Sequence, residues 1–196
     1  MVHTIVCIVP GFTEGHGTSR ELRKLLVEQG FTISKKPEQA DIVIAHSGGC
    51  FVIPEQATPK LTILINVPYW PRKYTAVSIC EKITTTFIES LSRHTLRQWL
   101  MKLYQGSMYG MRMRHNLEML IGTKQGTLWK RTDLHTIVIR NMQDMFCTPD
   151  LKILPFATKP LFLELPGSHD DCWDNPKAYA AIIQKYHEQY VLAKTV

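Results

Sequence analysis

Short runs of apolar residues alternate along the chain with segments of helical periodicity. Leu22, Leu25 and Leu26 share one face of a helix predicted over residues 19–29, and a second helix is predicted over residues 176–190. The apolar runs are rich in Ile, Val or Leu and predict strands over residues 4–9, 31–34, 41–46, 61–67, 136–139 and 161–165. Strands of this composition are typical of a parallel sheet that is buried on both faces.

The alternation of strands and helices is typical of parallel βαβ units. Right-handed crossovers place helices on both faces of such a sheet, so we expect a three-layer α/β/α sandwich with a mostly parallel sheet of about six strands. A chain of 196 residues has the usual size of one domain, and we expect a single domain over residues 1–196. Ligands bind beyond the carboxyl ends of parallel strands, so functional residues are expected directly after strands.

Three predicted strands are followed by a serine, an acidic residue and a histidine, in that order along the chain. The strand over residues 41–46 runs into Ala45-His46-Ser47-Gly48-Gly49, with small residues two positions before and two positions after the serine. A nucleophile elbow requires this spacing, because the backbones of strand and helix cross closely there. Ser47 is therefore the candidate nucleophile.

The elbow resembles that of the α/β-hydrolase superfamily, whose usual pattern is Gly-x-Ser-x-Gly. Some small bacterial lipases of this superfamily use Ala-x-Ser-x-Gly instead. The resemblance implies an α/β-hydrolase fold that is trimmed at its N-terminus by the family's first two strands. It also implies a Ser-His-Asp triad, with the acid and the base in loops that follow later strands.

Two later segments are similar to the family's acid and base loops. Residues 139–149 place Asp144 a few residues past a strand, and residues 165–173 place His169 before the last helix. The resemblance thus implies that Asp144 is the acid and His169 the base of the triad. Asp150, Asp170 and Asp171 are alternative acids.

The resemblance also implies an oxyanion hole and a reaction. The family takes one backbone N–H from the residue after the nucleophile, here Gly48, and one from the loop after the first core strand. Pro10-Gly11-Phe12 is similar to the family's His-Gly-x segment in that loop, which makes Phe12 the second donor. The implied function is a carboxylesterase-like serine hydrolase that cleaves an ester or thioester of a small acyl substrate through an acyl-enzyme. We expect no cofactor and no metal, since the histidines show no HExxH or comparable ligand spacing.

Two other functions stay open. The GxxxGxG spacing of residues 11–17 and the pair Tyr69-x-x-x-Lys73 resemble short-chain dehydrogenases, which bind NADP at a glycine-rich turn. Pro71 interrupts that pair, whereas the family keeps its Tyr and Lys one turn apart on a helix. A non-catalytic binding protein on a hydrolase fold is the other alternative, because function depends on the site and not on the fold.

Residues 69–134 form a long segment in which the family often inserts a cap, and we expect a helical cap here. Met108 and Met111, together with His46, are candidate substrate-pocket residues, because flexible thioethers adapt to apolar acyl groups. Residues 92–131 contain eight Lys or Arg residues and one acidic residue, Glu118. Such a surface could contact anionic substrates or lipid headgroups, whereas no motif indicates nucleic-acid binding.

Composition indicates a soluble protein. Hydrophobic residues make up 44% and charged residues 20% of the chain, and no apolar run has the ~18 residues of a membrane span. The first apolar run has neither a basic leader nor a cleavage site, so we expect no signal peptide. The five cysteines are irregularly spaced without a CxxC pair, which favours a reducing compartment, the cytoplasm.

Overall fold

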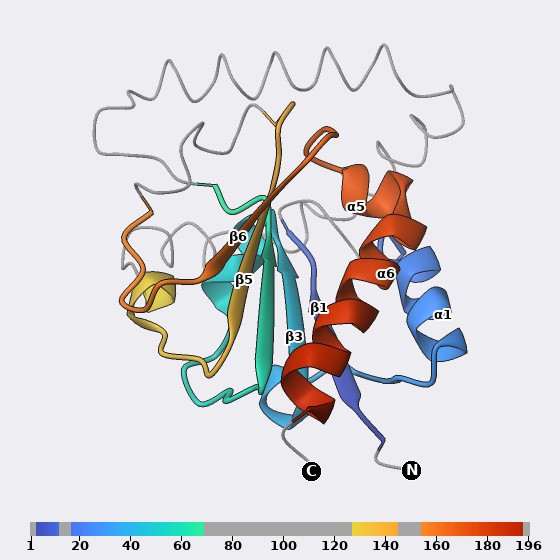
Figure 1. Ribbon diagram of the computed structural model, residues 1–196, viewed down its shortest axis with the longest axis horizontal. Coiled ribbons are helices and arrows are strands. Elements are labelled where there is room, and N and C mark those ends of the chain that lie inside the picture. The colour runs from blue at the N-terminus through green and yellow to red at the C-terminus, as the bar shows by residue number, and fades with distance from the viewer. Residues whose placement is uncertain (1–2, 12–16, 69–126, 145–153, 194–196) are drawn as a thin grey trace, which may run out of the picture.

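The fold is built around one parallel sheet (Figure 1). The computed structural model describes residues 3–11, 17–68, 127–144 and 154–193. The sheet has six strands in the order β2-β1-β3-β4-β5-β6, and every neighbouring pair is parallel. The strands are β1 (Ile5–Val9), β2 (Thr32–Ser34), β3 (Ile42–His46), β4 (Leu61–Ile65), β5 (Thr136–Asn141) and β6 (Leu161–Leu165). The expected α/β class and strand number are confirmed.

The strand order creates a switch point between β1 and β3. The chain leaves β1 for β2 on one side of the sheet and leaves β3 for β4 on the other side. Neighbouring parallel strands whose connections leave in opposite directions open a crevice at their carboxyl ends. Val9 at the end of β1 pairs with Ala45 near the end of β3, so this switch point lies beside Ser47.

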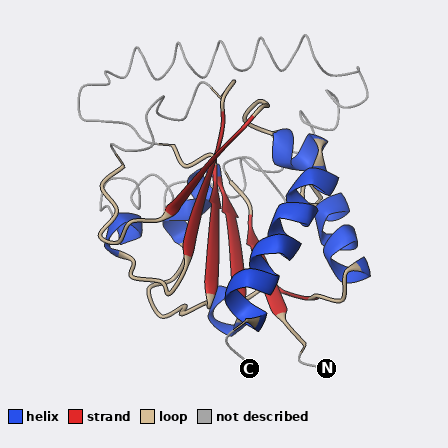
Figure 2. Cartoon of the chain, in the orientation of Figure 1, coloured by secondary structure: helices blue, strands red, loops and turns tan. Residues whose placement is uncertain are grey.

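Each face of the sheet has its own core and its own helices. Helices α1 (Arg20–Glu28) and α6 (Pro176–His187) cover one face, with Leu26 and Ile183 in its core. The 3-10 helices η2 (Ser47–Val52) and η4 (Thr127–Lys130) cover the other face, with Phe51 and Leu128 in its core. Figure 2 shows α1 and α6 side by side on the same side of the sheet. Helices therefore lie on both faces, as the sequence predicts.

The outer strands are less buried than the sequence predicts. Every residue of β3 and β4 is buried, whereas no residue of β2 or β6 reaches that level, and Leu161 in β6 is 39% exposed. The expectation of burial on both faces is correct for these central strands and wrong for β2 and β6. Each outer strand pairs on one side only, and the two helices pack over the middle of the sheet.

Several element ends differ from the predicted ones. Strand β4 ends two residues early because Asn66 adopts a φ of 52°, in the left-handed region where a strand cannot continue. Strand β5 runs on to Asn141, since its last residues pair with β6. Helix α6 ends at His187 and continues as the π-helical turn η6 (Glu188–Leu192), and the short helix α5 (Asp171–Asp174) precedes it.

A buried ion pair joins the segment before β5 to the loop before β4. Two nitrogens of the Arg131 guanidinium each donate to a different carboxylate oxygen of Asp133 over 2.8 Å. The same guanidinium donates to the carbonyls of Pro54 and Ala57, and Thr62 donates its hydroxyl to Asp133. The two charged side chains are only 10% and 8% exposed. The pair therefore has little access to water that could replace a lost partner.

We expect Asp133→Ala to lower the free energy of unfolding by about 3–5 kcal/mol, because it leaves the charge of Arg131 buried without its partner. Urea denaturation measures the change. Glu164→Ala is the matched control, since Glu164 is 52% exposed in its pair with Arg140, and it should cost less than about 1 kcal/mol. Similar losses in the two variants would contradict the argument from burial.

Part of the predicted organisation falls on residues that the structure does not describe. Residues 69–126 of the expected cap lie outside the described residues, as do Phe12, Met108, Met111 and Asp150. Among the described residues, no helix has both the length and the apolar character that crossing a membrane requires.

Candidate active site

Ser47 lies at a sharp turn directly after the central strand β3. It is the first residue of the 3-10 helix η2, and its φ is 51°. Non-glycine residues rarely adopt this left-handed conformation, which costs about 1–3 kcal/mol and often marks a functional site. A strained turn from strand to helix is the geometry of a nucleophile elbow. Ser47 is 7% exposed.

The elbow passes very close to the segment that follows β1. A Cβ atom at Gly49 would lie 2.4 Å from the carbonyl oxygen of Pro10 and 2.7 Å from that of Val9. Both contacts are with backbone, which cannot swing away as the end of a side chain can. Ala45, on the other side of the serine, is completely buried. The close approach of the backbones thus explains why residue 49 is glycine.

We expect Gly49→Ala to lower the free energy of unfolding by about 1–3 kcal/mol through overpacking. It should also impair any activity of Ser47, because the elbow must shift to admit the methyl group. Thermal unfolding and an assay of the serine measure the two effects. A variant with wild-type stability would show that this backbone contact is not tight.

The predicted base and acid are hydrogen-bonded to each other. Nδ1 of His169 and Oδ2 of Asp144 are 2.7 Å apart. The Asp144 side chain is completely buried, and the His169 side chain is 18% exposed. Because the carboxylate accepts the proton on Nδ1, Nε2 is left as the basic nitrogen of the neutral ring. An imidazole in this tautomer can take a proton from a hydroxyl.

The segments that carry these two residues are joined by backbone hydrogen bonds. We call residues 141–144 the acid turn and residues 166–170 the base loop. Within the acid turn, the N–H of Asp144 donates to the carbonyl of Asn141 over 3.0 Å. Gln143 N donates to the carbonyl of Gly167 in the base loop, also over 3.0 Å. The two segments are therefore held side by side.

Two buried side chains donate to the backbone carbonyl of His169. Nε2 of His46 is 2.8 Å and Nδ2 of Asn66 is 2.7 Å from that oxygen. The carbonyl can only accept, so Nε2 of His46 carries its proton. The ring centroids of His46 and His169 are 4.8 Å apart, and Trp173 lies edge-on to His46 at 5.3 Å. The residue next to Ser47 is thus in direct contact with the predicted base.

A second pair of polar side chains holds the residue before the base. Asn141 donates its Nδ2 to the carbonyl of Ser168 over 2.7 Å, and its Oδ1 accepts the Tyr179 hydroxyl over 2.7 Å. Burial raises the pKa of Tyr179, so its hydroxyl stays protonated and donates. Asn66 and Asn141 are completely buried. Both side chains contribute to a hydrogen-bonded network beneath the base loop.

The sequence analysis did not single out Asn66 or Asn141. One signal was present, because each is an asparagine at the carboxyl end of an apolar strand, where functional side chains are expected. Their partners, however, lie far away in sequence: Asn66 and His169 are separated by 103 positions. His46, proposed as a pocket residue, is completely buried, which favours a structural role over contact with substrate.

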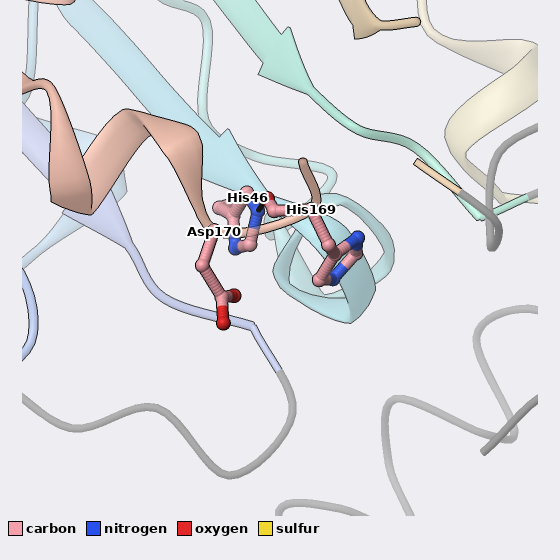
Figure 3. A group of neighbouring side chains, drawn as sticks. All are labelled: His46, His169 and Asp170. Atoms are coloured by element: carbon pink, nitrogen blue, oxygen red, sulfur yellow. Dashed lines mark hydrogen bonds between the residues drawn. The ribbon is translucent and has the colours of Figure 1, made fainter. Parts of the chain in front are cut away.

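The other predicted acids are placed differently from Asp144. Figure 3 shows the carboxylate of Asp170 and the ring of His169 pointing in different directions. Asp171 packs against the turn at Gly167, because a Cβ atom added to Gly167 would lie 2.5 Å from Cγ of Asp171. Burial raises the pKa of the Asp171 carboxyl. Among the described residues, Asp144 is the acid on Nδ1 of His169. Gly48, the predicted oxyanion donor after Ser47, is buried in the elbow.

One group of side chains has metal-ligand chemistry. Ligand atoms of His46, His169 and Asp170 lie within 4.8 Å of one another, the one such group in the part of the chain that the structure describes. Nδ1 of His169 is hydrogen-bonded to Asp144, and the side chains of His169 and Asp170 diverge (Figure 3). A zinc site needs ligands that converge on one point, so this group does not resemble one.

Comparisons with known proteins identify the fold. No protein-family model matches the chain, and a search of curated proteins finds no match. Solved structures do match over nearly the whole chain. The epoxide hydrolase VrEH1 of Vigna radiata is 12% identical with a TM-score of 0.61, over 96% of this chain and 92% of that chain.

Two further structures point the same way. The thioesterase domain from the curacin biosynthetic pathway is 17% identical with a TM-score of 0.59, over 93% of this chain and 91% of that chain. MGS-MChE2, an α/β hydrolase enzyme from a lagoon-sediment metagenome in Morocco, is 11% identical with a TM-score of 0.52, over 96% of this chain and 92% of that chain. At these identities the similarity establishes the architecture and not the chemistry. The chain has the α/β-hydrolase fold.

Proposed function

We propose that this protein is a serine hydrolase that cleaves a carboxylic ester or thioester, with Ser47 as nucleophile, His169 as base and Asp144 as acid. The observation that carries the proposal is the 2.7 Å hydrogen bond between Nδ1 of His169 and Oδ2 of Asp144. Both residues follow the carboxyl ends of strands in the sheet in which Ser47 occupies a strained turn after β3. Structural similarity to hydrolases that include a thioesterase supports the reaction class.

The mechanism follows from the tautomer of His169. Nε2 removes the proton of Ser47 as its oxygen attacks the acyl carbonyl, and the imidazolium then gives that proton to the leaving group. The acyl-enzyme is hydrolysed by water, with His169 acting as base again. Asp144 keeps the ring in this tautomer and stabilises its positive form.

The oxyanion would be stabilised by backbone N–H groups at the switch point. Gly48 follows the nucleophile, and Phe12 follows the segment that packs against the elbow at Gly49. Donors at these positions would act on the charge that develops on the carbonyl oxygen. The donor role of Phe12 stays a prediction.

The strand order argues against the dehydrogenase alternative. Dinucleotide-binding folds of that type order their strands 3-2-1-4-5-6. Here β3 lies beside β1, and β2 lies at the edge. The glycine-rich segment therefore follows β1 in a different architecture.

We assign substrate selection to residues 69–126 of the predicted cap, because η4 at residues 127–130 packs on the sheet with Leu128 in its core. Met108 and Met111 remain the proposed pocket residues for an apolar acyl chain. The basic stretch over residues 92–131 remains a proposed contact for anionic groups, except for Arg131, which is buried in its pair with Asp133. The chemistry of the triad does not distinguish esters from thioesters. A panel of both with graded acyl lengths would rank them.

Labelling by a fluorophosphonate probe tests the proposal, because the probe reacts covalently with an activated serine. We expect the purified protein to be labelled and the adduct to map to the peptide that contains Ser47. Absence of labelling in the folded protein, together with no turnover of the ester and thioester panel, would overturn the proposal in favour of a binding protein on a hydrolase fold.

A further inference from the structure

The carboxamide of Asn66 bridges the acid turn and the base loop. Its Nδ2 donates to the carbonyl of His169 over 2.7 Å, and its Oδ1 accepts the backbone N–H of Asn141 over 2.9 Å. Asn141 opens the acid turn that carries Asp144, and His169 is the predicted base itself. One side chain directly after β4 thus contacts both the segment that carries the acid and the segment that carries the base.

The two contacts demand opposite polarities. The carbonyl of His169 needs a donor, and the N–H of Asn141 needs an acceptor. A carboxamide supplies both in one plane, whereas a carboxylate has no donor and a hydroxyl is too short to reach both partners. Because Asn66 is completely buried, water has no easy access to replace either bond.

Asn66 both donates to the base carbonyl and accepts from the acid turn. His46 donates to the same oxygen from β3, and its ring also contacts His169 and Trp173. Asn141 reaches the base loop through the carbonyl of Ser168, one residue before the base. Asn66 is therefore placed to fix the base relative to the acid, because it reaches both the carbonyl of His169 and the N–H of Asn141.

We propose that Asn66 is a positioning residue, whose carboxamide holds the imidazole of His169 in register with Asp144. The proposal rests on the function proposed above. Small displacements of a catalytic base are costly, since about 1 Å of misplacement can lower the rate of the chemical step about a hundredfold. Asn66 touches no reacting atom, so it acts only through the base and the acid.

A purely conformational role for Asn66 makes a different prediction. Its φ of 52° is one that asparagine tolerates and that glycine adopts freely. If only the backbone mattered, Asn66→Gly would be silent. If the carboxamide positions the base, Asn66→Gly impairs the chemical step, and Asn66→Asp, which keeps the shape but loses the donor, does so as well.

The experiment measures kcat, KM and thermal unfolding for both Asn66 variants with an ester that the wild type cleaves. We expect kcat to fall about tenfold to a hundredfold, with KM changed less than about twofold. Proton NMR supplies a readout that needs no turnover: the low-field signal of the Nδ1 proton of His169 should weaken or shift in Asn66→Gly.

Thr62→Val is the matched control. Thr62 lies on β4, the strand that Asn66 follows, is completely buried and donates to Asp133 rather than to the acid turn or the base loop. We expect it to lower the melting temperature while kcat stays within about twofold. Wild-type kcat and an unchanged proton signal in Asn66→Gly, or an equal loss of kcat in Thr62→Val, would overturn the positioning role.

The same set of measurements separates this inference from the proposed function. A wild type that is neither labelled by the probe nor active on any ester or thioester overturns the hydrolase proposal, and the positioning role with it. An active wild type whose Asn66 variants are also fully active overturns the positioning role alone.

Discussion

Replacing Ser47 by alanine is expected to abolish labelling by a fluorophosphonate and to lower kcat for ester hydrolysis by about a millionfold. The reason is chemical, because the alanine methyl group cannot attack a carbonyl, and His169 and Asp144 then have no hydroxyl to activate. Removing the serine or the histidine of such a triad costs nearly as much as removing all three members. Residual hydrolysis would come from binding and from the oxyanion donors alone.

Ser34→Ala is the matched control for this variant. Ser34 also lies at the carboxyl end of a parallel strand, but its hydroxyl contacts the backbone of Lys36 at an exposed position. The Ser34→Ala variant should be labelled by the probe and should hydrolyse the ester at the same rate as the wild type. Both variants should unfold at temperatures close to that of the wild type. Full labelling of Ser47→Ala would place the reactive nucleophile elsewhere in the chain.

The central sheet was predictable because its signal is local. Runs such as residues 41–46 and 61–67 are rich in Ile, Val and Leu, which is typical of a strand covered on both faces. The same rule failed for residues 161–165, whose composition is similar but whose position is at the edge of the sheet. Position in a sheet depends on long-range pairing, which composition does not encode.

The elbow was predictable for a similar reason. Ala45, Ser47 and Gly49 lie within five positions, and the steric demand that selects them acts over that short distance. Asp144 and His169 followed from their places after strands and from a family resemblance. The structure places these two in contact, which their sequence separation of 25 positions does not require.

The supporting network was not predictable from sequence. Asn66 reaches one partner 75 positions and another 103 positions away, and neither contact leaves a local pattern. A buried asparagine in a left-handed conformation at a strand end also occurs in ordinary turns. The structure distinguishes this bridging asparagine from an ordinary turn residue, because both Nδ2 and Oδ1 of its carboxamide are hydrogen-bonded to distant segments.

Asp144→Asn is expected to lower kcat by about ten-thousandfold while the fold stays intact. An asparagine has the same shape as the aspartate, but it can present its NH2 group to Nδ1 in place of an oxygen. Nδ1 then accepts a hydrogen bond and carries no proton, so the proton of the neutral ring moves to Nε2. That tautomer cannot take the proton of Ser47. The amide also lacks the charge that stabilises the imidazolium during the reaction. Steady-state kinetics and fluorophosphonate labelling rates measure the loss.

Asp170→Asn is the control that decides between the predicted acids. Asp170 is adjacent to His169 in sequence and carries the same charge, and its carboxylate lies near the ring, but the carboxylate hydrogen-bonded to Nδ1 is that of Asp144. A general loss of negative charge near the base would affect both variants alike, because electrostatic effects at such distances depend little on orientation. A loss confined to Asp144→Asn would identify the contact with Nδ1 as its cause. If Asp170→Asn lost activity and Asp144→Asn kept it, the assignment of the acid would be wrong, and the hydrogen bond between Asp144 and His169 would serve the fold alone.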